Sequence, residues 1–314
     1  FYDTPFPKDL TIGKEQVLPK IITDIPRVSL DNETIGIVLG NSSFWDSTIV
    51  SKASTHENIK NVREYFHDLF GLSDHEIVPS QYWFFSDGIS SSDFRSIFDP
   101  SMGYIKRKII SNLEYSDKNN LDIIIYYSGE GTTYNGEKVL LPYDASLTKS
   151  TTFFSIRKLY SDLLDIKSMP EVGNITLFMD VDFNNPAFDQ NLVKNIEETG
   201  KKKKKKNKKG KEDDTFATLP KEIMPPKELT VFFASNTTQL AYDHPNHESS
   251  MFTYYLLKGL KGEADNGDKK VTVSELHDYV MKNVQDTTKT LFNDLPQIPI
   301  LFTSDPNRVL YQLP

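Results

Sequence analysis

Short apolar runs and helically spaced apolar residues alternate along most of the chain. The runs predict buried strands, because strands covered on both faces are almost continuously apolar. They lie at 34–40, 82–85, 121–127, 175–179 and 229–234. Between them, apolar residues three and four positions apart predict helices over 54–70, 104–113, 156–164, 251–260 and 273–284. Strands separated by helices indicate an α/β fold with a mainly parallel central sheet and helices on both faces.

Two of the predicted helices carry capping signals. The first is expected to open with the capping box Ser54–Glu57, and the last with the box Thr272–Glu275. The buried side of the first helix is predicted to consist of Ile59, Val62, Phe66, Leu69 and Phe70. That of the second helix is predicted to consist of Tyr104, Ile105, Ile109, Ile110 and Leu113.

Two segments do not follow this alternation. Residues 1–30 hold scattered prolines and no sustained period, which predicts an N-terminal arm on the surface. Residues 188–227 hold a lysine run and then prolines, which predicts a long Lys-rich mobile insertion. The remainder, 31–314, is expected to form one domain that contains this insertion.

The composition excludes several kinds of chemistry. The chain has no cysteine, so disulfides, zinc-thiolate sites and thiol nucleophiles are all absent. The formal net charge is −8 although Lys201–Lys211 alone holds nine lysines, so the rest of the chain is strongly acidic. An acidic body repels nucleic acid, which leaves the lysine run either as a polyanion contact or as a solvated loop.

The location of the protein is open at this stage. No apolar stretch approaches the ~18 residues of a membrane span, so we expect a soluble protein without a transmembrane segment. The given chain begins with Phe1, which suggests a processed or trimmed form. The cytoplasm and an organelle lumen both fit these features.

Polar residues follow two of the predicted strands. The strand 121–127 runs into Ser128–Gly131, and the strand 175–179 runs into Asp180–Phe183. Ligands of parallel sheets bind beyond the carboxyl ends of the strands, so any chemistry is expected there.

At these two strand ends the sequence resembles the caspase-like cysteine peptidases, most closely their metacaspase and bacterial caspase-homologue branch. The family has Ser-Gly-His-Gly where this chain has Ser128-Gly129-Glu130-Gly131, and both continue into a Leu-Leu-Pro-x-Asp-Ala stretch, here Leu140–Ala145. The family's Asp-x-Cys is Asp180-Val181-Asp182 in this chain. Further similarities, such as the Phe-Thr helix from Met251, extend the resemblance over about 34–305.

The resemblance implies a caspase-like (caspase-haemoglobinase) fold whose catalytic histidine and cysteine are replaced by Glu130 and Asp182. Cleavage in this family needs a thiolate and an imidazole, so we expect a pseudopeptidase that acts as a protein-binding or scaffold subunit within a larger assembly, without a cofactor. It also implies a vestigial oxyanion hole at Gly131 and a vestigial substrate pocket at Asp180 and Asp243. Two close carboxylates repel each other unless a cation or a basic side chain lies between them.

One alternative is a metal-dependent hydrolase, or a silent cation site, that uses Glu130, Asp180 and Asp182. None of the histidines ends a predicted strand, so none is expected to replace the missing imidazole; they are His56, His67, His75, His244, His247 and His277. His244 and His247 lie near the expected pocket but supply no nucleophile. The segment Asp265–Thr272 lacks the spacing of a calcium loop and predicts a turn instead.

Overall fold

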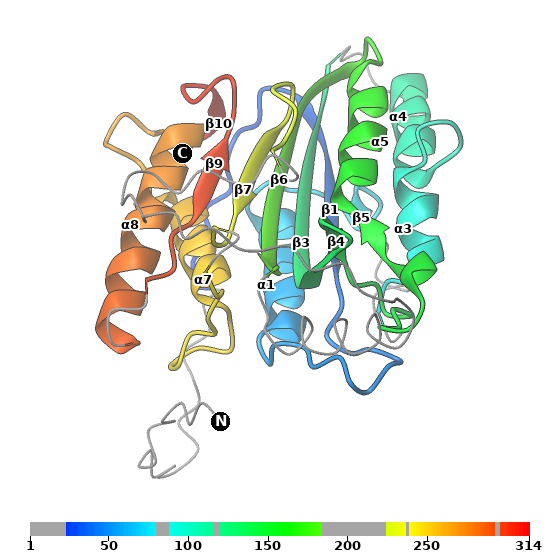
Figure 1. Cartoon of the computed structure of the whole chain (residues 1–314). Helices are drawn as coiled ribbons and strands as arrows, with labels where there is room; N and C mark the ends of the chain where they lie inside the picture. The colour runs from blue at the N-terminus through cyan, green and yellow to red at the C-terminus, as the bar shows by residue number, and fades with distance from the viewer. Residues whose placement is uncertain (1–22, 80–87, 116–119, 184–223, 237–238, 293–295) are drawn as a thin grey trace.

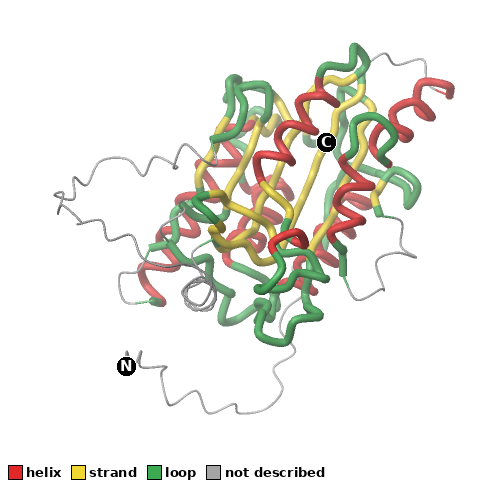
Figure 2. The backbone as a smooth tube through the Cα atoms, turned by 45° about the vertical axis from the view of Figure 1, so that its right-hand side comes forward, coloured by secondary structure: helices red, strands yellow, loops and turns green. Residues whose placement is uncertain are grey.

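The computed structural model of the chain describes residues 23–79, 88–115, 120–183, 224–236, 239–292 and 296–314. They form three layers, in which a central sheet lies between two groups of helices (Figures 1 and 2). The expected α/β architecture is therefore present.

The main sheet has the strand order β2-β1-β3-β6-β7-β9, with β4 paired to β3 and β5 to β4. The first five strands of that order run parallel, and β9 is antiparallel to β7. Their bounds are Ile77–Val78 (β2), Glu33–Gly40 (β1), Leu121–Tyr134 (β3), Val172–Asp182 (β6), Thr230–Phe233 (β7) and Ile300–Phe302 (β9). The long strands β1, β3 and β6 lie at the centre, so their carboxyl ends meet at one edge.

Each face of the sheet packs on three helices. One face packs on α3 (Ser91–Phe98), α4 (Tyr104–Tyr115) and α5 (Ile156–Lys167), on the right in Figure 1. The other face packs on α1 (Thr55–Asp68), α7 (Met251–Lys258) and α8 (Val273–Leu291). Successive strand residues point to opposite faces, which explains why the central strands are apolar at nearly every position.

Two smaller β elements complete the fold. β3 continues past the central sheet into a hairpin with β4 (Glu137–Leu140), which in turn pairs with β5 (Phe154–Ser155). A two-stranded antiparallel sheet joins β8 (Lys270–Thr272) to β10 (Val309–Gln312). Asp265 Oδ1 accepts hydrogen bonds from the N–H groups of Gly267 and Lys269, so the segment before β8 is a turn, as the sequence predicts.

The structure differs from the sequence predictions at several points. The capping box Thr272–Glu275 is present, but Ser54 makes no side-chain cap at the start of α1, so the box predicted there is wrong. Ile110 is 47% exposed and does not belong to the buried side of α4. Helix α3 and strands β4, β5, β8, β9 and β10 were not predicted, because each is short or lacks a sustained period.

Some predictions concern segments that lie wholly or partly outside the described residues. The strand predicted at 82–85, and most of the insertion with Lys201–Lys211, lie outside the described residues. So do residues 1–22 of the N-terminal arm, but its end packs on the body, since Val28 is buried and its N–H donates to Leu69 O at 2.9 Å. Within the described part of the chain, no helix has the length and apolar character needed to cross a membrane.

Candidate functional site

Glu130 and Asp182 lie beside each other where the pairing of β3 with β6 ends: Asp182 is the last residue of β6, and β3 continues past Glu130 into the hairpin with β4. They are directly opposite in the parallel register, and both are nearly inaccessible, at 1% and 4% exposure. Glu130 Oε1 accepts a hydrogen bond of 3.1 Å from the backbone N–H of Lys52, in the loop between β1 and α1. The structure therefore brings together the two residues that the sequence places at the positions of the family's catalytic dyad.

Asp180 is a buried hub of hydrogen bonds two residues before Asp182. Its Oδ2 atom accepts from Asn58 Nδ2 at 3.2 Å, from Thr253 Oγ1 at 2.7 Å and from Ser250 Oγ. Ser250 also caps α7, because its hydroxyl accepts from the N–H of Thr253 at 3.0 Å. Asp180 therefore holds α1, β6 and the start of α7 together.

Asp243, the second predicted pocket residue, lies in the loop before α7. Its carboxylate accepts the hydroxyl hydrogen of Ser54. Ser54 does not cap α1 because its backbone is helical, with φ −73° and ψ −17°, whereas a capping residue is extended. The backbone of Asp243 pairs with that of Ser250, whose side chain contacts Asp180. Both predicted pocket carboxylates are thus connected through Ser250, and each already has partners within the chain.

Lys52 supplies a positive charge to this carboxylate cluster, which we define as Glu130, Asp180, Asp182 and Asp243. The Lys52 Nζ atom is fully buried and has no hydrogen-bond partner among the described residues. Burial alone lowers the pKa of Lys52, but the four carboxylates outweigh it and leave the pKa above its ordinary value. Lys52 is therefore the intervening basic side chain that close carboxylates require.

Gly131 has a packing reason to be glycine. A Cβ atom at this position would lie 2.6 Å from the ring of Phe183 and 2.8 Å from Val181 Cγ1, far inside contact distance. No side chain fits there unless Phe183 moves. The role of Gly131 as a vestigial oxyanion hole stays a prediction, because packing alone accounts for the residue.

The histidines near the expected pocket stack with tyrosines. The rings of His244 and His247 lie 4.4 Å apart, and both lie against Tyr254 of α7. Burial, with the neighbouring His247, lowers the pKa of His244 to about 4, so its imidazole is neutral at neutral pH. His277, on α8, lies against Phe232 instead. The geometry places these rings in packing contacts.

The cation-site alternative gains no support from the geometry. Among the described residues, no three histidine, aspartate or glutamate side chains are arranged to hold a metal ion. The described part of the chain includes Glu130, Asp180 and Asp182, the three ligands proposed from the sequence. The buried Lys52 Nζ provides the compensating charge there.

Several residues of the site were missed by sequence reasoning. Lys52 lies in a loop without a recognisable motif, Ser54 was assigned to a capping box, and Asn58 lies on a helix whose pattern indicated only its apolar side. Thr253 belongs to the Phe-Thr signal at the start of α7, and Ser250 precedes it; the signal indicated no role for their hydroxyls. Their contacts with Asp180 and Asp243 join segments that lie far apart in sequence.

Comparisons with known proteins agree with this arrangement. No curated protein matches the chain. A family model described as Caspase domain matches residues 34–311, from the start of β1 to β10, and so covers the three-layered body described above. The match includes both strand ends and the loop that carries Lys52. The chain therefore belongs to the caspase domain family.

Proposed function

We propose that this chain is a caspase-fold pseudopeptidase that binds a protein partner and does not cleave peptides. The observation that carries the proposal is the charge arrangement at the dyad positions, where Glu130 and Asp182 lie beside each other with the Lys52 ammonium in the same cluster. The absence of cysteine removes the family's nucleophile everywhere in the chain.

The remaining groups of the cluster are poor substitutes for a catalytic dyad. A lysine acts as a nucleophile or base only when it is deprotonated, and the raised pKa keeps the Lys52 amine protonated. Asp180 is held by three side-chain hydrogen bonds and Asp243 by Ser54, so neither is free to move protons for a substrate. This arrangement supports a structural role for the former catalytic centre.

The first test is a peptidase assay on the full chain. We expect no turnover of a diverse peptide library, either with a chelator or with added magnesium, calcium or manganese, because no activated nucleophile is present. The matched control is the double variant Glu130→Gln/Asp182→Asn, which alters both dyad positions with little change of volume. Turnover by the unaltered chain that disappears in this variant would show that the carboxylate cluster is an active site.

A solvent-exposed tryptophan near the site supports a binding role. Trp45 is 79% exposed and Val50 is 67% exposed, both in the loop that carries Lys52. Trp45 also lines a groove of about 340 Å³ together with Asp144 and Lys149. Tryptophan is highly buried on average, and it is enriched with tyrosine and arginine at interface hot spots. We place the partner-binding surface at this loop and groove.

The second test is a pull-down from the native source with variants of this surface. Trp45→Ala is expected to weaken capture of a stoichiometric partner by about 30-fold or more, the effect of losing a hot-spot side chain. The matched control is Met102→Ala, since Met102 is 72% exposed and lies between α3 and α4. If Trp45→Ala retains the partner, or if the unaltered chain captures none, this surface is not the binding site.

A further inference from the structure

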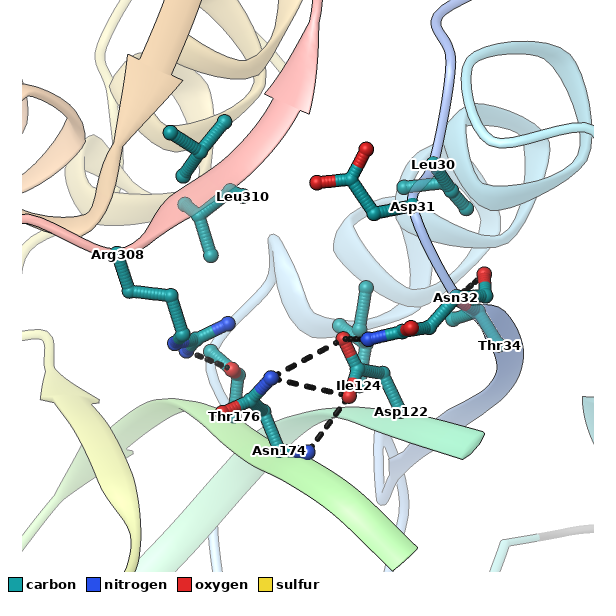
Figure 3. Close-up of a pocket in the computed structure, with 11 residues that line it drawn as sticks. Leu30, Asp31, Asn32, Thr34, Asp122, Ile124, Asn174, Thr176, Arg308 and Leu310 are labelled. Carbon is teal, nitrogen blue, oxygen red and sulfur yellow. Dashed lines mark hydrogen bonds between the residues drawn. The ribbon is translucent and has the colours of Figure 1, made fainter. Parts of the chain in front are cut away.

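A pocket lies at the opposite edge of the sheet from the carboxylate cluster. It is formed where β1, β3 and β6 begin, under the β10 strand, and it encloses about 200 Å³ (Figure 3). Leu30, Asp31 and Asn32 border it on one side, and Arg308 and Leu310 on the other. The pocket lies on the face of the sheet that packs on α1, α7 and α8, at a point covered by the β8–β10 sheet instead of a helix.

The floor of this pocket is polar, in a sheet face that is otherwise apolar. Thr34 on β1 is opposite Asp122 on β3, and Thr176 on β6 is opposite Ile124, two residues further along β3. The Asp122 carboxylate accepts hydrogen bonds from the N–H of Asn174 at 2.6 Å, from Asn174 Nδ2 at 3.1 Å and from Asn32 Nδ2 at 3.2 Å. These donors are neutral, so none of them offsets the charge of the Asp122 carboxylate at the base of the pocket.

Arg308 brings a partly buried cation to the other side. Its Nη2 atom donates to Thr176 Oγ1 at 2.8 Å, which is the only side-chain hydrogen bond of the guanidinium with described residues. Burial lowers the pKa of Arg308, although Asp122 and Asp305 act in the opposite direction, and an arginine remains charged. Within the described chain, no carboxylate forms an ion pair with the guanidinium.

A partly buried guanidinium with spare donors favours a carboxylate ligand. Its fork of N–H groups matches a carboxylate in two parallel hydrogen bonds, and the partial exclusion of water strengthens them. A simple anion would be repelled by the Asp31 and Asp122 carboxylates, which line the pocket on the β1–β3 side (Figure 3). A ligand that also carries an ammonium group turns this repulsion into attraction.

Besides the carboxylate and the ammonium group, the apolar part of the lining favours an aliphatic group in the ligand. Leu30, Ile124 and Leu310 contribute aliphatic surface to the pocket. A space of about 200 Å³ is below the usual range for cofactors and drug-sized ligands, but it accommodates a molecule of up to about nine heavy atoms, since a cavity of about 150 Å³ holds benzene. The pocket thus combines a cation, two carboxylates and an aliphatic wall within a small volume.

We propose that this pocket binds a free aliphatic α-amino acid, with its carboxylate on Arg308, its ammonium group toward Asp31 and Asp122, and its side chain against Leu30, Ile124 and Leu310. The proposal does not rest on the absence of peptidase activity. The pocket is built from the amino ends of the strands whose carboxyl ends carry Glu130 and Asp182, so the two sites share no residue.

The direct test is calorimetric titration of the full chain with L-leucine and with analogues that each lack one feature. L-Leucine should bind saturably. 4-Methylpentanoate, which lacks the ammonium group, and 3-methylbutylamine, which lacks the carboxylate, should each bind about tenfold or more weakly, the effect of losing a charged hydrogen bond. Glycine should also bind more weakly, because it lacks the aliphatic side chain.

Variants then place the binding in this pocket. Arg308→Gln should abolish leucine binding, whereas Arg157→Gln should not, since Arg157 is 68% exposed on α5. Asp31→Asn, at an exposed position, should weaken leucine and strengthen 4-methylpentanoate, because it removes a carboxylate that attracts the ammonium group and repels a simple anion; it remains informative if Arg308→Gln fails to fold. The proposal is overturned if leucine does not bind saturably, if it binds no better than 4-methylpentanoate, or if neither pocket variant changes its affinity.

Discussion

Replacement of Lys52 by methionine is expected to destabilise the protein by about 3–5 kcal/mol at pH 7, as measured by urea unfolding. Methionine keeps most of the side-chain volume but removes the charge from a cluster of four carboxylates. Removing one partner of a buried ionic group leaves the others uncompensated, and losses of this size are typical of such changes. The variant should therefore unfold at much lower urea concentration with an unchanged slope.

The matched control for this variant is Lys60→Met. Lys60 lies on α1 with its side chain 50% exposed and pairs with Glu57 at 3.3 Å, so its loss should change stability by no more than about 0.5 kcal/mol. If Lys52→Met and Lys60→Met unfold alike, Lys52 does not neutralise the cluster. The electrostatic reason for an inactive centre would then have to be abandoned.

The unaltered chain and the Lys52→Met variant should also differ in how their stability depends on pH. Burial lowers the pKa of Lys52, but the carboxylates outweigh it, so the folded pKa lies above the unfolded value of about 10.4. A raised folded pKa contributes stability below the unfolded pKa, and this contribution is lost as pH rises through the folded value. The advantage of the unaltered chain over Lys52→Met should therefore be constant from pH 7 to about 9 and decrease at higher pH.

Much of the fold could be predicted from the sequence because its central strands are covered on both sides. The runs that became β1, β3, β6 and β7 are almost continuously buried, which leaves a clear apolar signal. The two strand ends were recognised for the same reason, since polar residues such as Glu130 and Asp180 interrupt those runs abruptly. Short elements such as α3 and the β8–β10 pair have no such signal.

The electrostatics of the site could not be predicted in the same way. Lys52 reaches the cluster from a loop whose path depends on tertiary structure, and an isolated lysine in a loop is ordinarily exposed. Ser54 illustrates the same limit, because its sequence neighbours fit a capping box while its hydroxyl donates to Asp243, far along the chain. The local pattern predicted a contact within the same helix turn, and the structure gives the hydroxyl a partly buried carboxylate of a distant segment.

The contacts that Asp180 and Asp243 make within the chain also change how variants of these residues must be interpreted. Asp180 and Asp243 were expected to form a vestigial substrate pocket, but the structure gives both of them partners within the chain. Lys52 also supplies a positive charge to both carboxylates. If a variant of Asp180 loses a binding partner, loss of folded structure is therefore the first explanation to test, and loss of recognition the second.

Asp180→Ala is expected to cost about 3 kcal/mol of unfolding free energy, even though it removes one of four mutually repelling carboxylates. The substitution leaves the Asn58 amide and the Ser250 and Thr253 hydroxyls without their shared acceptor in a buried place, at about 1–3 kcal/mol for each unsatisfied group. Relief of repulsion offsets part of that sum. Urea unfolding measures the loss, with Asp278→Ala, at a side chain 73% exposed, as the control.

The location of the faster hydrogen exchange distinguishes loss of the Asp180 hydrogen-bond network from general destabilisation. The N–H of Ser250 donates to Asn58 Oδ1 at 3.0 Å, so its hydrogen exchange should accelerate in Asp180→Ala more than that of amides in α5. In the Lys52→Met background the cost of Asp180→Ala should fall well below 3 kcal/mol, because each carboxylate removed then relieves uncompensated charge. Strictly additive costs would mean that Lys52 and Asp180 do not interact, and the carboxylate cluster would not act as one electrostatic unit.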